Sequence, residues 1–394
     1  MNMIIGIDLG TTNSLVSYFS EKGTVIIPNR FGEKLTPSVV SFGDNGEVYV
    51  GKVAKERMIT HPESTKELFK RSMGSKKEFI INENKFTAEE LSSFIIRSLK
   101  EDAEEYLGSE VIEAIISVPA YFNDKQRKAT QLAGKLAGLK VERIVNEPTA
   151  AAIAYGLQNR NTNTKFLVFD LGGGTFDVSI LEVYKNIMEV HAIAGDNYLG
   201  GDDFTEILVN MFLRANELEA CNLDSTTIAI IKKQAEEAKK MFSKQKEVII
   251  KCKVNDEILK YKISLDDYEK NCELLLAKIR KPIERALKDA EIKLYDIDEI
   301  LLIGGATKLP IIRNFVGKLF GRLPNISINP EEAVALGAGI QGAMKERNEL
   351  IKDIVLTDVC PYTLGTEISV LKEGEYYEGG HFCPIIERNT VVPV

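Results

Sequence analysis

The chain has 394 residues, of which 44% are hydrophobic, so it can bury several cores and should divide into more than one unit. Its formal net charge of −8 argues against a protein that binds nucleic acid or an anionic membrane surface, because both functions favour a basic face. Since no basic region precedes the N-terminal apolar run and no apolar stretch approaches the roughly 18 residues that span a bilayer, we expect a cytoplasmic protein with no nucleic-acid or membrane partner.

One segment of the sequence occurs twice. The first copy is IIGIDLGTTNSLV at residues 4–16, and the second is FLVFDLGGGTFDVSI at residues 166–180. Each copy has a β-rich run, an Asp-Leu-Gly turn with threonine, and a second β-rich run, which is typical of a hairpin with a tight loop. The matching aspartates, Asp8 and Asp170, lie 162 residues apart, about one domain length. The repeat therefore predicts two similar α/β lobes, each beginning with a hairpin.

Helix signals occur in both halves of the chain. Thr87 and Glu90 form a capping box ahead of a segment with one apolar stripe. Residues 229–243 also place their apolar side chains on one face. Asn329 and Pro330 predict a further helix, with Asn329 as its N-cap and Pro330 as its first residue. Strands that alternate with helices in each half indicate the α/β class.

The pattern changes near the C-terminal end of the sequence. Residues 353–359, DIVLTDV, form a short apolar run flanked by acids, and Pro361 follows. We interpret residues 348–359 as a linker that can pair as an edge strand. Residues 360–394 are β-like but too few to close a domain core, so we expect the chain to stop inside a domain.

The two Asp-Leu-Gly loops contain the residue types that bind phosphate. Glycines let the backbone approach closely and turn its N–H groups inward, and the threonines add hydroxyl donors. Asp8, Asp170 and Asp177 would repel a bare triphosphate, so their presence suggests a divalent ion and its waters between carboxylate and phosphate. Together these features indicate phosphoryl transfer. The alternative is a pair of tight turns with solvated aspartates, which the duplication disfavours.

Two other glycine-rich segments lie outside the repeat. Residues 337–342 fit the pattern G-x-G-x-x-G, but they lie inside the predicted helix after Asn329 and have no strand before them. We therefore interpret them as a site of close helix packing. The turn at residues 302–310 follows a buried-type strand and suits either a nucleoside or a plain strand-to-helix turn.

These motifs resemble, in order along almost the whole chain, those of the DnaK family, the seventy-kilodalton heat-shock chaperones. The resemblance is carried by IDLGTTNS at 7–14, VPAYFND at 118–124, NEPTAAA at 146–152 and DLGGGTFD at 170–177. It implies a two-lobed actin-like ATPase fold with duplicated ribonuclease-H-like lobes and a C-terminal β fragment. Three further segments are similar to the HscC branch of the family, namely LFKRSMG at 68–74, TDVCPY at 357–362 and PIIERNT at 384–390.

The resemblance also implies domain boundaries. Residues 1–159 would form lobe I of the ATPase domain, with 38–88 as its peripheral subdomain. Residues 160–347 would form lobe II, with 200–278 as its peripheral subdomain. Residues 348–359 would be the interdomain linker, and 360–394 the start of a truncated β substrate-binding domain.

The resemblance places ATP or ADP, Mg²⁺ and K⁺ in the cleft between the lobes. The metal ions would lie near Asp8, Asp170 and Asp177. Catalysis would fall to Lys70, Glu147, Thr175 and Asp177, with Lys70 positioning the attacking water. Residues from five parts of the chain would contact the nucleotide: Gly10, Thr11, Thr12, Asn13, Gly172, Gly173, Gly174, Thr175, Gly200, Gly201, Glu236, Lys239, Ser243, Gly304, Gly305 and Lys308.

The function implied by the resemblance is that of a monomeric chaperone ATPase, whose hydrolysis cycle controls peptide binding by the adjoining domain through the linker. Client peptides and a J-domain co-chaperone would be its partners, with Arg143, Asn146 and Asp358 near the J-domain site and a relay through Pro119 and Arg127. The stretch of residues 245–264 is short compared with the same stretch in DnaK, which leaves open whether the protein depends on a nucleotide exchange factor. A small-molecule kinase and an actin-like filament ATPase of the same fold are the alternatives, and neither has a use for the apolar linker.

Overall fold

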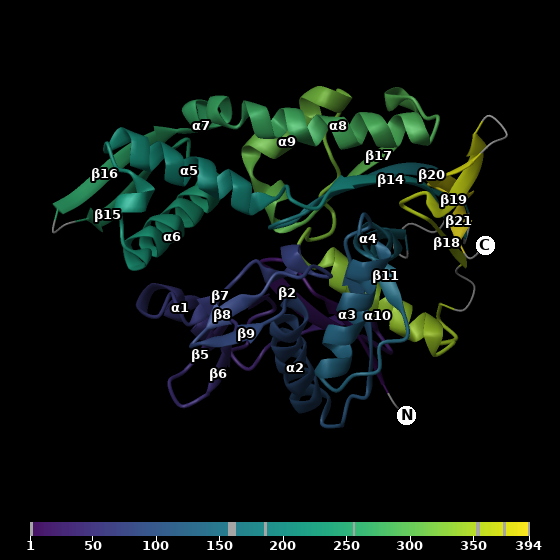
Figure 1. Cartoon of the computed structure of the whole chain (residues 1–394), viewed down its shortest axis with the longest axis horizontal. Coiled ribbons are helices and arrows are strands. Elements are labelled where there is room, and N and C mark those ends of the chain that lie inside the picture. The colour runs from purple at the N-terminus through teal and green to yellow at the C-terminus, as the bar shows by residue number, and fades with distance from the viewer. Residues whose placement is uncertain are drawn as a thin grey trace.

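The computed structural model describes residues 3–156, 163–184, 187–254, 257–351, 355–372 and 376–392. It has two α/β lobes that face each other, as the sequence predicted (Figure 1). A C-terminal β segment lies at one end of the pair. Within the described residues, no helix combines the length and the apolar character needed to cross a membrane.

The first sheet is built around an antiparallel hairpin with a parallel strand beside it. Its strand order is β11–β10–β1–β2–β3, and β4 also pairs with β2. Strand β1 runs antiparallel to β2 and parallel to β10. The bounds are β1 Ile4–Asp8, β2 Asn13–Ser20, β3 Gly23–Ile27, β4 Thr36–Pro37, β10 Glu113–Val118 and β11 Ile144–Asn146.

The second sheet repeats this arrangement and confirms that the sequence repeat is a structural duplication. Its order is β17–β12–β13–β14–β18–β21. Strand β12 is antiparallel to β13 and parallel to β17, as β1 is to β2 and β10. Asp170 pairs with Asp177 across this hairpin, whereas Asp8 pairs with Leu15 across the first, so the second hairpin alone has two facing acids. The bounds are β12 Thr164–Leu171, β13 Phe176–Tyr184, β14 Ile187–Asp196, β17 Glu299–Ile303, β18 Val355–Val359 and β21 Val391–Val392.

Two helices, α4 (Glu147–Gly156) and α10 (Ala333–Lys345), join the lobes, because one hydrophobic core contains their residues together with residues of both sheets. A Cβ on Gly337 would lie 1.8 Å from the carbonyl oxygen of Ala150, and one on Gly6 would lie 2.2 Å from the amide nitrogen of Gly339. The prediction of close helix packing at residues 337–342 is therefore confirmed. Helix α10, which the sequence placed in lobe II, packs against β1 and β2 of the first sheet.

The start of α10 differs from the prediction. The helix begins at Ala333, so the prediction of Asn329 as its N-cap and Pro330 as its first residue is wrong. The side-chain oxygen of Asn329 instead accepts the amide of Glu331 within a turn before the helix. The carbonyl of Pro330 accepts the amide of Gly304 at 2.9 Å, so this segment is held by a turn of lobe II that the local sequence does not reveal.

Outer helices cover the first sheet. Helix α2 (Ala88–Leu107) begins with the predicted capping box, in which Thr87 and Glu90 each accept the other's backbone N–H. Its buried residues pack on the sheet together with α3 (Asp124–Leu136). The peripheral part of this lobe comprises β5 Val40–Phe42, β6 Val48–Val50, α1 Lys52–Thr60, β7 Thr65–Lys66, a short 3₁₀ helix η1 Phe69–Ser72, β8 Phe79–Ile81 and β9 Asn84–Phe86.

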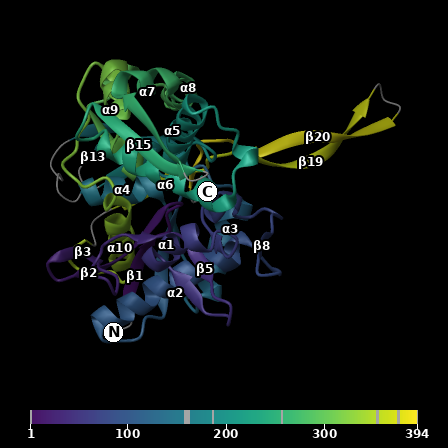
Figure 2. The ribbon, with the colours of Figure 1, turned by 90° about the vertical axis from the view of Figure 1, so that its left-hand side faces the viewer.

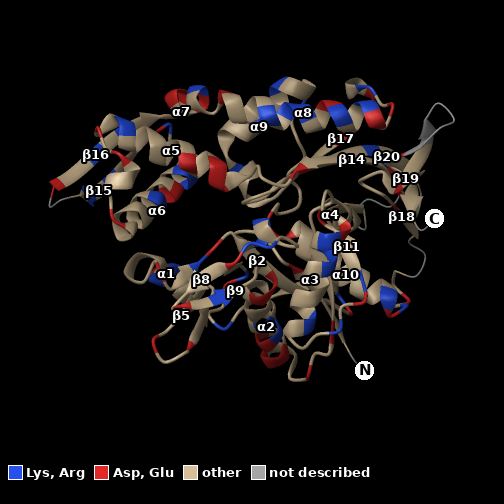
Figure 3. Cartoon of the chain, viewed as in Figure 1, with Lys and Arg blue, Asp and Glu red and all other residues tan. Residues whose placement is uncertain are grey.

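The second lobe has a larger peripheral part. Helix α6 (Ser225–Met241) buries Ile231, Ala235 and Ala238 on one face, as residues 229–243 predicted. The C-terminal half of this helix carries a basic, an acidic and a second basic pair of side chains (Figure 3). The remaining elements are α5 Gly201–Ala215, β15 Glu247–Val254, β16 Glu257–Ser264, α7 Leu265–Asn271, α8 Glu273–Asp289 and α9 Pro310–Phe320.

The C-terminal segment is attached to the second sheet. Strand β18 pairs parallel to β14 from Val355 to Thr357 and antiparallel to β21. The pairing predicted for residues 353–359 is thus confirmed from Val355 onward, but the predicted edge position is wrong, because β21 pairs with β18 on its other side. Asp353 and Ile354 lie outside the described residues. The hairpin of β19 (Leu364–Lys372) and β20 (Tyr376–Ile386) extends away from the lobes (Figure 2).

Candidate functional site

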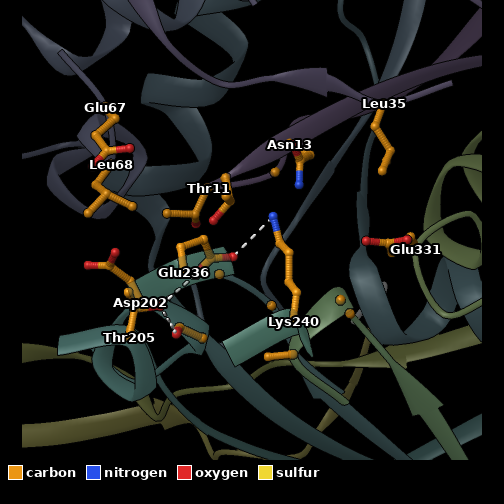
Figure 4. A pocket seen from close by; sticks show the side chains of 18 of the residues that line it. Thr11, Asn13, Leu35, Glu67, Leu68, Asp202, Thr205, Glu236, Lys240 and Glu331 are labelled. Atoms are coloured by element: carbon orange, nitrogen blue, oxygen red, sulfur yellow. Dashed lines mark hydrogen bonds and ion pairs between the residues drawn. The ribbon is translucent and has the colours of Figure 1, made fainter. Parts of the chain in front are cut away.

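A cavity of about 660 Å³ lies between the two lobes. Thr11 and Asn13 from the first hairpin line one side, and Glu236 and Lys240 of α6 line another (Figure 4). The cavity contains most of the residues that the sequence singled out: Asp8, Gly10, Thr11, Thr12, Asn13, Lys70, Glu147, Asp170, Gly172, Gly173, Thr175, Gly201, Glu236, Lys239, Ser243, Gly304, Gly305 and Lys308.

The two hairpin loops touch each other at one wall of this cavity. A Cβ on Gly173 would lie 1.6 Å from Oγ1 of Thr12, and one on Gly174 would lie 2.5 Å from Cγ2 of Thr11. The carbonyls of residues 172 and 173 accept the amides of Gly201 and Asp202 at 2.8 Å, which ties the second loop to the start of α5. Glycine is required at 173 and 174 because the loops of both lobes approach so closely.

Three aspartates lie where the central strands meet these loops: Asp8 and Asp170 are near the ends of β1 and β12, and Asp177 is near the start of β13. Asp170 and Asp177 are 5% and 1% exposed, and Asp8 accepts a hydrogen bond from Ser117 at 2.9 Å. Burial, followed by the nearby Glu147 carboxylate, raises the pKa of Asp8 to about 7 and that of Asp177 to about 8. The pKa of Asp170 is also well above its usual value, first because of burial and then because of Glu147.

A buried ion pair stands beside these acids. Nζ of Lys70 lies 2.8 Å from Oε1 of Glu147, and the two side chains are 3% and 10% exposed. Lys70 comes from η1 and Glu147 from the first turn of α4, so two separate segments of the chain place the pair. Such a pair holds an ammonium group in a fixed position inside a site from which water is largely excluded.

The acids leave room for a hydrated cation. Oδ2 of Asp170 is buried without a hydrogen-bond partner, and Lys70 is the cation whose charge lowers the pKa of all three aspartates. In the described part of the chain, no three acidic, His or Cys side chains converge closely enough to bind a bare metal ion. Mg²⁺ commonly keeps several of its waters, so contact through water fits this arrangement.

The other end of the cavity is lined by charged groups that already pair with one another. Glu236 accepts a hydrogen bond from Thr205 at 2.6 Å and forms ion pairs with Lys239 and Lys240. Burial acts to raise the pKa of Glu236, but the nearby Lys239 and Lys240 together with the hydrogen bond from Thr205 lower it to about 2. Lys308 pairs with Glu331. Oxygen and ammonium groups at this end can hydrogen-bond the hydroxyls and nitrogens of a nucleoside.

Three predicted residues do not line the cavity. Gly174 and Gly200 lie behind the second loop, where a Cβ on Gly200 would be 2.4 Å from the amide nitrogen of Gly174. Asp177 is covered, and one of its carboxylate oxygens accepts the amide of Tyr121 at 3.2 Å. These three residues therefore support the site from behind its wall.

Sequence reasoning missed several residues that the fold brings to the site. Lys232 of α6 pairs with Glu67 of lobe I at 2.9 Å and with Asp202 of lobe II at 3.1 Å, so it links the two lobes. Glu67 and Asp202 lie at the same end of the cavity (Figure 4). Ser117, the partner of Asp8, directly precedes the VPAYFND segment. Its position next to this segment was the one feature of the sequence that could have identified Ser117 as a site residue.

Comparisons with known proteins agree with the geometry. The chain matches the family model described as Hsp70 protein over residues 4–394. Chaperone protein DnaK of Thermotoga petrophila is 45% identical over 405 residues, which cover 99% of this chain and 66% of that protein. Chaperone protein DnaK of Thermosipho melanesiensis is 43% identical over 404 residues, with the same two coverages. The chain thus spans just under two thirds of the length of these relatives, and the similarity to the HscC branch stays a prediction.

Proposed function

Because the chain belongs to the Hsp70 family, we propose that it is the ATPase motor of a chaperone and that it binds and hydrolyses ATP in the cavity between its lobes. The observation that carries this proposal is the meeting of two glycine loops from different lobes beside the Lys70–Glu147 pair and three aspartates. As part of the same proposal, we assign the activity and partners of the longer relatives to this chain.

The phosphates would lie against the two loops. Residues 10–13 and 172–175 would offer backbone N–H groups and threonine hydroxyls to the phosphate oxygens, with Gly201 beside them in the cavity and Gly200 behind the second loop. Bound Mg²⁺ would supply positive charge that offsets the phosphates, and Asp8 and Asp170 would hold its waters. A K⁺ ion beside Asp177 and Thr175 belongs to this proposal as well.

The base and ribose would occupy the other end of the cavity. Glu236, Lys239 and Ser243 line it on the side of α6, and Gly304, Gly305 and Lys308 line it on the side of the glycine turn. The φ of +82° at Gly304 turns the chain sharply after β17, and a Cβ there would lie 2.3 Å from the carbonyl oxygen of Leu171. The position of Gly304 and Gly305 in the lining of the cavity supports the choice of the nucleoside site over a plain turn.

Hydrolysis would depend on position and charge more than on covalent chemistry. Lys70, held by Glu147, would orient the attacking water and donate to the γ-phosphate as negative charge develops there. Thr175 and Asp177 would assist from the second hairpin. Family membership disfavours the alternatives of a small-molecule kinase and a filament-forming ATPase.

The attached β18 strand supports a role in controlling a substrate domain. Asp358 of β18 accepts hydrogen bonds from Asn146 at 2.8 Å and Thr149 at 3.1 Å, and Arg127 donates to Asn146 at 2.6 Å. This chain of contacts connects the linker to the segment that follows Pro119. We propose that ATP state is coupled through it to peptide binding, in a monomeric cytoplasmic protein that works with a J-domain co-chaperone and, where one is required, a nucleotide exchange factor.

Single-turnover hydrolysis of ATP with Mg²⁺ and K⁺ tests this proposal. Lys70→Ala should keep ATP affinity within several-fold but slow hydrolysis by about 100-fold or more, because it removes charge stabilisation in the transition state. Lys85→Ala, which changes a Lys in an exposed ion pair, is the matched control and should hydrolyse normally. Normal hydrolysis by Lys70→Ala would contradict the assigned mechanism.

A further inference from the structure

Arg71, the residue after Lys70, connects η1 of lobe I to two segments of lobe II. Its Nε donates to the carbonyl oxygen of Gly174 at 3.0 Å, and its Nη2 donates to Oδ2 of Asp203 at 2.7 Å. The same Oδ2 accepts the backbone N–H of Gly200 at 2.7 Å. One guanidinium group therefore holds the second phosphate loop and the start of α5 at once.

Arg71 acts from behind the wall of the cavity. Lys70, Gly173 and Thr175 line the cavity, whereas Arg71, Gly174 and Asp203 are absent from its lining among the described residues. A Cβ on Gly174 would lie 2.7 Å from Nε of Arg71, so the guanidinium is packed directly on the loop. This position favours a role for Arg71 that acts through the loop.

We propose that Arg71 is a positioning residue for the hydrolysis, which sets the second phosphate loop relative to Lys70 when the lobes are closed. The inference rests on the proposed ATPase function. Lys70 and Arg71 are neighbours in η1, so a bond from Arg71 to Gly174 fixes the distance between the Lys70 segment and the loop of residues 172–175. The contact joins the two lobes directly.

The chemistry of the contact requires arginine. A planar guanidinium can bond a carbonyl and a carboxylate in two fixed directions, whereas lysine presents a single point charge. The Arg71 and Asp203 side chains are 18% and 29% exposed, so the pair is less screened by water than a surface pair. An interaction that aligns groups for the transition state raises kcat more than it raises affinity for ATP.

A second ion pair between the lobes provides a matched comparison. Lys232 joins Glu67 to Asp202, and Asp202 precedes Asp203 in the first turn of α5. No contact from the Lys232 side chain to the carbonyl or side-chain atoms of residues 172–175 occurs among the hydrogen bonds and ion pairs of the described residues. Loss of Lys232 should therefore loosen lobe closure without releasing the loop.

Hydrogen–deuterium exchange on the nucleotide-free protein, followed by single-turnover hydrolysis, tests the inference. Arg71→Gln should speed exchange in peptides that cover residues 172–176 and slow hydrolysis by about 10- to 100-fold, the loss that a misplacement of about 1 Å causes. Its affinity for ATP should stay within threefold of that of the unchanged protein. Arg71→Lys should not restore the rate, while Lys232→Gln should leave exchange at 172–176 unchanged.

Three results would overturn the inference. The first is unchanged loop exchange and an unchanged rate in Arg71→Gln; the second is recovery of the rate in Arg71→Lys. The third is the same loop exchange and the same hydrolysis rate in Arg71→Gln and Lys232→Gln, which would mean that Arg71 only links the two lobes. If Arg71→Gln fails to fold, Asp203→Asn removes the carboxylate partner and must show the same loop exchange. Normal hydrolysis by Lys70→Ala would instead defeat the proposed function, and the exchange data would still decide the role of Arg71 in the loop.

Discussion

The closeness of the two phosphate loops can be tested by adding one methyl group. In Gly173→Ala, the new Cβ would lie 1.6 Å from Oγ1 and 2.7 Å from Cβ of Thr12. Rotation of the Thr12 hydroxyl can relieve the first contact but not the second, because Cβ is fixed to the backbone. Ordinary contact begins at 3.4 Å, so the two loops must move apart by several tenths of an ångström or more.

This displacement should affect the reaction strongly. The loops belong to different lobes, so the added methyl group between them would hold the Lys70 side of the cavity away from the second loop. Because a misplacement near 1 Å can cost about 100-fold in rate, we expect single-turnover ATP hydrolysis to fall by about 10- to 100-fold. The affinity for ATP should fall as well, since both loops are proposed to contact the phosphates.

Gly317→Ala is the matched control for this experiment. Gly317 lies in α9, and the nearest atom to its new Cβ would be the carbonyl oxygen of Arg322 at 3.9 Å. This variant should hydrolyse ATP normally and gain about 0.5–1 kcal/mol of stability from the better helix propensity of alanine. Hydrolysis at the normal rate by Gly173→Ala, in a folded protein, would refute the claim that the two loops must meet for the reaction.

The remaining predictions concern the acids and the linker. Asp170→Asn should raise the Mg²⁺ concentration needed for half-maximal hydrolysis, because an amide attracts a hydrated cation less; an unchanged requirement would count against the metal assignment. The raised pKa values of Asp8 and Asp177, about 7 and 8, make the folded state bind more protons than the unfolded state above the usual value of 3.8. The stability of the nucleotide-free protein should therefore fall as pH rises from about 4 to 8. Asp170→Asn should melt at a higher temperature than the unchanged chain at pH 8 but not at pH 4. If the melting temperatures of the two proteins differ by the same amount at both pH values, the buried carboxylates are not the cause. Replacing Val355 and Leu356 with Asp should lower the ATPase rate to that of a chain cut before residue 353 and should abolish ATP-dependent protection of the linker from protease. Equal cleavage of the linker in ATP and ADP in the unchanged chain would contradict this coupling.

Local patterns were sufficient for the duplicated hairpins and for several helices. The β-rich runs on both sides of each Asp-Leu-Gly turn predicted both hairpins, because β-branched and aromatic residues favour strands and the glycine-containing turn joins them. The capping box at Thr87 predicted the start of α2, because its bonds link residues only three apart. The family resemblance, which rests on short motifs in a fixed order, then brought in the site residues that these patterns alone did not reach.

Contacts between segments that are distant in the chain could be identified only from the tertiary structure. The true start of α10 depends on a bond from Gly304 to the carbonyl of Pro330, and nothing near Asn329 reveals it. Lys70 and Glu147 are 77 residues apart, and Arg71 and Asp203 are 132 apart. Hydrophobic periodicity and capping depend on neighbours in the chain, so a sequence can show them. Which charges pair across the cleft depends on how two lobes pack, and that packing alone decided that Arg71 and Lys232 join them.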